Sequence, residues 1–161
     1  MIKITEWRQD DLVAIRSFIE QLQEHERSLV PMLKPGCEIS ADYLQKLLNK
    51  IEACNGLMLV ARTTNPANSV GFICSWMAHD DDELLKEEAR AYAYISDIFV
   101  EPNYRQNGIA SKLLQEVEQL MIKRGAKQIR LCSKSANSHA LQCYDRNGYS
   151  AYETILTKQI G

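Results

Sequence analysis

The stretch that decides the fold is Ile98-Phe99-Val100-Glu101-Pro102-Asn103-Tyr104-Arg105-Gln106-Asn107-Gly108-Ile109-Ala110, which joins a strand pattern to a helix pattern. Upstream, residues 91–100 (AYAYISDIFV) are rich in aromatic and β-branched side chains, which predicts a long strand that stops at Pro102. Downstream, apolar side chains recur at helical spacing up to Met121, and this pattern predicts a helix over 108–124. The loop between these elements has few apolar side chains before Ile109, so it is available for binding.

The start of this helix has the chemistry of an anion site. The first turn of a helix presents unpaired backbone N–H groups and a partial positive charge, and a glycine at the bend lets a phosphate approach the backbone closely. Gly108 and Ala110 are the small residues that such an approach requires, and Arg105 adds a charged donor fork. The alternative is an ordinary strand-to-helix turn in which Gly108 serves the bend and Arg105 is solvated. The segment is neither G-x-x-x-x-G-K-[ST] nor G-x-G-x-x-G, which disfavours a nucleoside triphosphate or a dinucleotide.

The rest of the chain alternates strand and helix patterns. Their order, β-α-α-β-β-β-α-β-α-β, predicts a three-layer α/β or α+β domain with mixed strand directions. Residues 79–90 are strongly acidic and predict a surface loop in which a helical turn can form. The predicted elements are strands at 2–7, 56–62, 69–78, 91–100, 127–133 and 149–160, and helices at 12–22, 40–51, 108–124 and 137–148.

Composition excludes several classes of protein. The chain has 161 residues, the size of one domain, and 45% of them are hydrophobic, so it can bury its own core. The chain has 19 Lys and Arg against 21 Asp and Glu, which gives a formal net charge of -2. This net charge disfavours a nucleic acid or an anionic membrane as a partner. The five cysteines contain no C-x-x-C pair and the three histidines are isolated, so we expect reduced thiols and no metal site. The sequence shows no export or membrane-spanning segment, so we expect a cytoplasmic protein.

Two motifs give the chain a family resemblance. Arg105 to Ala110 (RQNGIA) matches the R/Q-x-x-G-x-G/A motif of the GNAT acetyltransferase superfamily, and it follows a strand as in that family. Asn137 to Gly148 (NSHALQCYDRNG) is similar to the family's N-x-x-A-x-x-x-Y-x-x-x-G helix. The resemblance covers the whole chain in element order. It implies one N-acetyltransferase domain over 1–161, with a mixed, mostly antiparallel central sheet of about six or seven strands flanked by about four helices.

The resemblance also implies an activity and a cosubstrate. The family transfers an acetyl group from acetyl-CoA to a primary amine of a small molecule or protein by direct attack, without a covalent enzyme intermediate. The two strands beside the cosubstrate splay apart after a bulge, expected near 97–99, and the pantetheine arm of CoA runs along the strand at 98–100. The implied cofactor-binding residues are Ile98, Phe99, Val100, Arg105, Gln106, Asn107, Gly108, Ile109, Ala110, Asn137 and Tyr144.

Tyr144 and Asp97 are the catalytic candidates. The family position of Tyr144 places its hydroxyl near the CoA sulfur, where a phenol that stays protonated at neutral pH can give a proton to the leaving thiolate. The alternative is an aromatic residue at the edge of the core. Asp97 can relay the proton of the amine, anchor a cationic acceptor, or serve as a structural acceptor at the bulge. Tyr94 lies near a catalytic position of some family members, but a phenol is a poor base. Cys143 has no base placed to activate it and is expected to be a small hydrophobe.

The acceptor is not identified by the sequence. We expect its recognition from the loop at 24–39, from Trp76 and from the acidic stretch at 80–88, although a solvated charge run is the commoner explanation of such a stretch. A non-catalytic domain that binds acyl-CoA is the alternative function. Only residues 149–161 follow Gly148 where the family usually has two strands, so either one bulged strand serves both roles or a second subunit completes the sheet. The second option is compatible with a homodimer.

Overall fold

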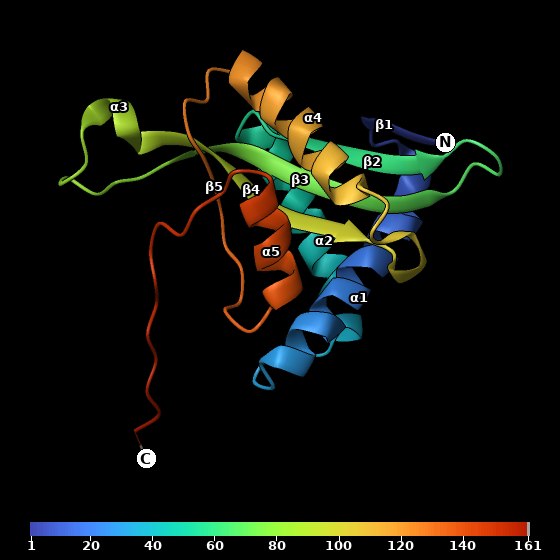
Figure 1. Cartoon of the computed structure of the whole chain (residues 1–161), viewed down its shortest axis with the longest axis horizontal. Helices are drawn as coiled ribbons and strands as arrows, with labels where there is room; N and C mark the ends of the chain where they lie inside the picture. Colours follow the sequence, from blue (N-terminus) through green and yellow to red (C-terminus); the bar gives the residue numbers. More distant parts are fainter. Residues whose placement is uncertain (161) are drawn as a thin grey trace.

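In the computed structural model, which describes residues 1–160, a five-stranded sheet in the order β1-β2-β3-β4-β5 separates two layers of helices (Figure 1). The elements are β1 (Ile2–Glu6), η1 (Gln9–Asp11), α1 (Leu12–Leu29), α2 (Gly36–Ala53), β2 (Leu57–Thr63), β3 (Ser69–His79), α3 (Glu87–Arg90), β4 (Ala91–Val100), η2 (Pro102–Tyr104), α4 (Ile109–Lys123), β5 (Ile129–Leu131) and α5 (Ser138–Arg146). The predicted α/β architecture with mixed strand directions is confirmed.

The sheet is antiparallel from β1 to β4 and parallel between β4 and β5. Parallel neighbours need a crossover connection, and α4 supplies it between β4 and β5. The predicted stripe on this helix is confirmed, because its apolar residues are buried against one face of the sheet. The buried residues of α4 are Ile109, Leu113, Leu114, Val117 and Met121.

The opposite face of the sheet is covered by α1 and α2. Phe18 of α1 stacks on Phe72 of β3 and on Phe99 of β4, with ring centroids 6.2 and 5.2 Å apart. Leu44 and Leu47 of α2 join the same buried cluster. This packing holds α1 and α2 against the middle of β4, which is the strand that carries the predicted site.

Two details differ from the sequence prediction. Residues 149–160 form no strand, so the described chain has five strands rather than six or seven. Ile155 and Leu156 are adjacent, so an extended segment there has no single apolar face to lay on the sheet. Residues 87–90 form the short helix α3 inside the expected acidic loop, which makes five helices rather than four. Among residues 1–160, no helix combines the length and apolar character needed to cross a bilayer.

Candidate functional site

The strands β4 and β5 separate in the middle of the sheet. Their parallel pairing ends at Ile95 opposite Leu131, and a cavity of about 230 Å³ opens beyond this point. A bulge accompanies the separation, because Cys74 and Ser75 of β3 pair with Asp97 and Ile95, which leaves Ser96 without a partner on β3. The bulge therefore falls one residue before the expected range 97–99, and the expected splay of the two strands is present.

The bulge decides which way Asp97 faces. Tyr94 lies opposite Trp76 on the side of the sheet that α1 and α2 cover, and their rings are 5.7 Å apart. Side chains three residues apart on a regular strand point to opposite faces. The extra residue Ser96 reverses this alternation, so Asp97 also faces the helices and contacts Tyr43 of α2.

Some of the predicted site residues line the cavity. It brings together Asp97 and Ile98 of β4 with Asn137 and Tyr144, which belong to the C-terminal helix and its cap. Trp76, Tyr94 and the acidic stretch at 80–88 do not line it, although they were candidates from the sequence. Its lining residues are Ile19, Leu22, Gln23, Glu26, Ile39, Tyr43, Ile95, Ser96, Asp97, Ile98, Leu131, Cys132, Ser133, Asn137, Ala140 and Tyr144.

Asp97 is a buried carboxylate that accepts a hydrogen bond from Tyr43 of α2. Its side chain is 7% exposed, and the Tyr43 hydroxyl donates to its two oxygens at 3.1 and 3.3 Å. Burial raises the pKa of Asp97 to about 6, the hydrogen bonds from Ser96 and Tyr43 oppose this rise, and the charge of Glu26 adds to it. Asp97 is therefore ionised at pH 7 and close enough to its pKa to exchange a proton.

Tyr43 is a site residue that the sequence prediction missed. The helical spacing assigns it to the apolar face of α2 together with Leu44 and Leu47. The hydroxyl was the available signal in the sequence, because a buried tyrosine needs a hydrogen-bond partner and therefore indicates a polar group near this helix face. Burial and the charge of Asp97 both raise the pKa of Tyr43, so this hydroxyl keeps its proton and remains a donor.

Tyr144 of α5 also lines the cavity. Burial raises the pKa of Tyr144 to about 12, and the charges of Cys143, Glu26 and Asp97 add to the rise. Its ring meets the ring of Tyr149 edge to face at 6.1 Å, and the Tyr149 hydroxyl donates to Glu118 at 2.7 Å, which fixes both rings. Burial also raises the pKa of the Cys143 thiol, which opposes formation of a nucleophilic thiolate.

Asn137 has a structural role at the start of α5. Its side-chain oxygen accepts a hydrogen bond from the backbone N–H of Ala140 at 3.3 Å and caps α5. This cap leaves the amide N–H groups of Asn137 available beside the cavity. The cap also sets where α5 begins, and thereby the position of Tyr144 seven residues further along.

The turn between β4 and α4 lies at the far end of β4 and does not line this cavity. Gly108 is the N-cap residue of α4 with φ of 71°, and a Cβ built on it would meet no atom within 4 Å. Gln106 also has a positive φ, of 62°. Among residues 1–160 no side chain caps the helix, so its first backbone N–H groups have no side-chain partner. These features fit a phosphate held by backbone groups.

The side chains of this turn stabilise the turn itself. Arg105 donates from Nε to the Val100 carbonyl at 2.9 Å and lies over the Phe99 ring at 5.7 Å. Asn107 donates from Nδ2 to the carbonyls of Tyr104 and Arg105. Arg105 also borders a second cavity of about 440 Å³ against α1. The backbone of the turn, rather than a freely extended Arg105, is the main candidate for holding a ligand.

The acidic stretch is directed away from the site. Asp80 accepts a hydrogen bond from Nη1 of Arg130 at 2.7 Å, and α3 lies at the far end of the β3–β4 hairpin (Figure 1). Glu26 is instead the acidic residue from the expected acceptor loop that reaches the cavity. Within residues 1–160, no group of three or more His, Cys, Asp or Glu side chains could hold a metal ion.

Comparison with known proteins finds similarity over most of the chain. The family model described as "Acetyltransferase (GNAT) family" matches residues 17–149. A thialysine N-epsilon-acetyltransferase of Bos taurus is 36% identical over 55 residues, which are 34% of this chain and 32% of the bovine protein. An uncharacterized N-acetyltransferase of Methanocaldococcus jannaschii is 26% identical over 113 residues, 70% of this chain and 46% of that protein. The chain thus spans less than half the length of these curated relatives.

A solved structure shares the fold over nearly the whole chain. AAC(6')-Iy in complex with the bisubstrate analog CoA-S-monomethyl-acetylneamine superposes with a TM-score of 0.71 and covers 100% of this chain and 99% of its own. The two sequences are 16% identical, so this likeness concerns the fold alone.

Proposed function

Because the chain belongs to the acetyltransferase (GNAT) family, we propose that it transfers an acetyl group from acetyl-CoA to a primary amine of a small molecule or protein. The observation that carries the proposal is the cavity at the splay of β4 and β5, which both Asp97 and Tyr144 line. A proton acceptor and a proton donor that line one cavity suit a reaction that removes a proton from an amine and returns one to a thiolate.

The turn before α4 is the proposed site for the phosphates of acetyl-CoA. Backbone N–H groups at Gly108, Ile109 and Ala110 begin an uncapped helix, where anions bind favourably. The space beside Gly108 is open, so a phosphate can approach its backbone, and a side chain at this position would occupy part of that space. The buried side chain of Ile109 anchors the helix start in the core, so its contribution to the ligand is through the backbone.

The thioester end is proposed to lie along β4 at the splay. Beyond Ile95, β4 has no partner on its β5 side, so backbone groups of residues 96–98 are available to an extended chain that takes the place of a strand. Acetyl-CoA supplies an acetyl group activated as a thioester. Backbone donors at this edge would stabilise the negative charge that develops on the thioester oxygen.

Asp97 is proposed to receive the amine. Asp97 and Glu26 give the cavity a negative charge, which attracts an ammonium group. Asp97 then accepts the proton that the nitrogen must lose, and its pKa of about 6 leaves it ionised for this task at neutral pH. Tyr43 holds the carboxylate in place through its hydrogen bond and thus acts as a positioning residue.

Tyr144 is proposed to protonate the leaving thiolate. Its hydroxyl keeps its proton at neutral pH because burial and nearby negative charges raise its pKa. Within residues 1–160, no hydrogen bond engages this hydroxyl as a donor, so it is free to reach a ligand. The packing of Tyr149 against its ring limits the directions it can take.

The test is a panel of amines assayed for release of CoA thiol from acetyl-CoA. The panel includes polyamines, aminoglycosides, amino acids, and peptides with a free lysine or N-terminus. We expect turnover with at least one class and a strong loss of kcat in the Asp97→Asn and Tyr144→Phe variants. Binding of acetyl-CoA without thiol release for any amine would instead indicate the non-catalytic acyl-CoA-binding function.

A further inference from the structure

The cavity has an acidic lining that no basic side chain balances. Glu26 and Asp97 both line it, and among residues 1–160 its lining includes no Lys, Arg or His. Neither carboxylate takes part in an ion pair within the described residues. Burial is the main cause of the raised pKa of Asp97 and of Tyr144, and the charge of Glu26 adds to both rises. The cavity therefore carries two negative charges, whereas a single ammonium group supplies one positive charge.

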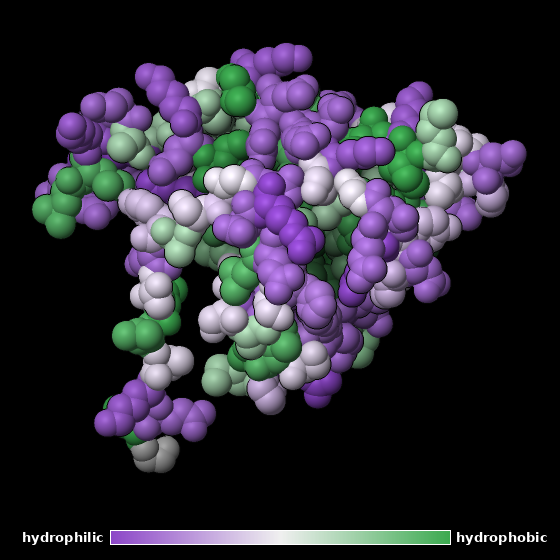
Figure 2. Space-filling view, in the orientation of Figure 1, coloured by the Kyte–Doolittle hydropathy of each residue, from purple (hydrophilic) through white to green (hydrophobic). Residues whose placement is uncertain are grey.

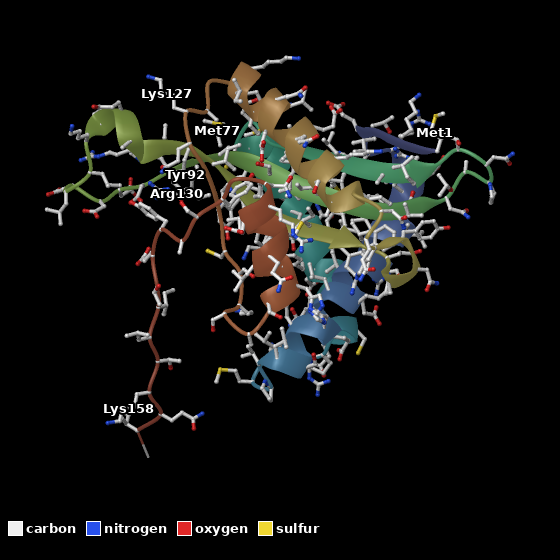
Figure 3. The ribbon with its side chains drawn as sticks, viewed as in Figure 1. Met1, Met77, Tyr92, Lys127, Arg130 and Lys158 are labelled. Atoms are coloured by element: carbon white, nitrogen blue, oxygen red, sulfur yellow. The ribbon has the colours of Figure 1, made fainter. Side chains whose placement is uncertain are left out.

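The charged groups around the cavity do not neutralise this lining. Arg27 of α1 pairs with Glu24 at 3.2 Å, where both side chains are exposed. Arg130 of β5 pairs with Asp80 at 2.7 Å, on the side of the molecule that carries the β3–β4 hairpin (Figure 3). Lys134, which follows β5, is exposed and does not line the cavity. The acidic stretch lies around α3 at the far end of the hairpin, where Figure 2 shows many hydrophilic side chains, so it is separate from the acidic cavity.

Glu26 occupies a position that is unfavourable for α1 itself. The helix ends at Leu29, so Glu26 lies in its last turn. The C-terminal end of a helix carries a partial negative charge, which disfavours an acidic side chain there and favours a cation. Asp97 is likewise a charged group at a buried position. A bound cation beside Glu26 would offset the unfavourable contact between its carboxylate and the end of the helix.

Gln23 adds a hydrogen-bond acceptor beside Glu26. Its Nε2 donates to the Lys34 carbonyl at 2.9 Å, which orients the side-chain amide. Within residues 1–160, no hydrogen bond engages its Oε1. Gln23 and Glu26 are three residues apart on α1, so their side chains are neighbours on the helix surface, and both line the cavity. An ammonium group has three N–H donors, so it can bind the amide oxygen and the carboxylate together.

An apolar stretch of α1 leads from the sheet to Glu26. Ile19 and Leu22 precede Glu26 at helical spacing, so the three side chains form one stripe of α1 that lines the cavity. Ile19 is buried in the cluster that includes Phe99, which shares a face of β4 with Asp97. Glu26 lies about 10 Å further along the helix axis than Ile19, with Leu22 between them. A ligand that reaches from Asp97 to Glu26 therefore has an apolar surface beside its middle.

We propose that the acceptor is a small dication, in which the amine beside Asp97 is acetylated while a second ammonium group, at the other end of an apolar stem, binds Glu26 and Gln23. This inference rests on the proposed acetyl transfer and makes Glu26 a specificity-determining residue. The C–N bond forms as the thioester C–S bond breaks, the amine proton goes to Asp97, and the thiolate receives a proton from Tyr144. Acetylation removes one of the two positive charges, so the product loses one ion pair with the cavity and is released more readily.

The test compares diamines with monoamines of the same chain length in the assay of thiol release from acetyl-CoA. The pairs are putrescine with butylamine and cadaverine with pentylamine. We expect kcat/KM of the wild type to be about tenfold or more higher for the diamine of a pair, the usual effect of one hydrogen bond between charged groups. Glu26→Gln should remove this preference, mainly by raising KM for the diamine. The matched control Glu20→Gln removes the same charge from α1 outside the cavity and should keep the preference.

Calorimetry of putrescine binding in the presence of CoA separates this inference from acetyl transfer, because CoA carries no acetyl group. Binding that weakens about tenfold or more in Glu26→Gln, and not in Glu20→Gln, would support the dication site whether or not any amine is acetylated. Monoamines that are acetylated as efficiently as diamines by the wild type would overturn the inference and leave the proposed acetyl transfer intact. Putrescine binding that is absent, or equal in the wild type and Glu26→Gln, would overturn it as well.

Discussion

Removal of the Tyr43 hydroxyl should move the pH dependence of the reaction. In Tyr43→Phe, Asp97 loses the donor that bonds both its oxygens while it stays buried beside Glu26. That hydrogen bond stabilises the charged form, so its loss raises the pKa of Asp97 above its value of about 6. A hydrogen bond to a charged group contributes about 1.5–3 kcal/mol, and one pKa unit corresponds to about 1.4 kcal/mol, so the rise is about one to two units.

The assay is kcat/KM for the best amine of the panel between about pH 5 and pH 9, measured as thiol release. The acidic limb of the profile should move to higher pH in Tyr43→Phe by this amount, while activity above it approaches that of the wild type. Titration of the amine itself is common to both enzymes and does not affect the difference. Tyr92→Phe, which removes a hydroxyl outside the cavity, serves as the control. An unmoved limb in Tyr43→Phe would show that Asp97 does not set the pH dependence.

Three further predictions concern the same chain. Tyr144→Phe should lower kcat about a hundredfold and leave the Kd of acetyl-CoA nearly unchanged in calorimetry; an unchanged kcat would remove Tyr144 from the mechanism. Gly108→Ala should weaken acetyl-CoA about tenfold or more, whereas Gly125→Ala, with a similar positive φ at the other end of α4, should cost similar folding stability without changing the Kd. Asp97→Asn should raise the free energy of unfolding by on the order of 2–3 kcal/mol at pH 8 and by little at pH 4, as measured by urea unfolding. The reason is that the pKa of Asp97 is raised in the folded state, so its ionisation opposes folding as pH rises through about 4 to 6. An equal gain at both pH values would contradict a buried charge at this position.

Much of the fold could be predicted from local patterns. The strand at 91–100, the turn with Gly108 and the helix that follows are each specified by residues within one short segment, and the structure has all three. The same holds for Asn137, whose capping role depends on a residue three positions away. Helix propensity, glycine conformation and caps act over a few residues, so they can be recognised in a sequence without knowledge of the fold.

The last strand is where local pattern failed. Residues 149–160 have β-prone side chains, but a strand exists only where another strand supplies hydrogen bonds. Within residues 1–160 this segment has no such partner, and its Tyr152 ring contacts the guanidinium of Arg130, which lies on β5. Whether the segment forms a strand therefore depends on whether another strand lies beside it in the folded protein.

By itself, the sequence determined the order of the longer strands and helices up to residue 148 and the glycine turn before α4, and its family resemblance gave the candidates Asp97 and Tyr144. Only the tertiary structure decided that Tyr43, 54 residues away, donates to Asp97, and that Glu26 shares their cavity. The physical reason is that the bulge at Ser96 reverses the alternation of β4, and the packing of α1 and α2 then decides which side chains meet the turned carboxylate. Local rules specify each element, whereas charge, burial and proton affinity at the site arise from contacts between elements.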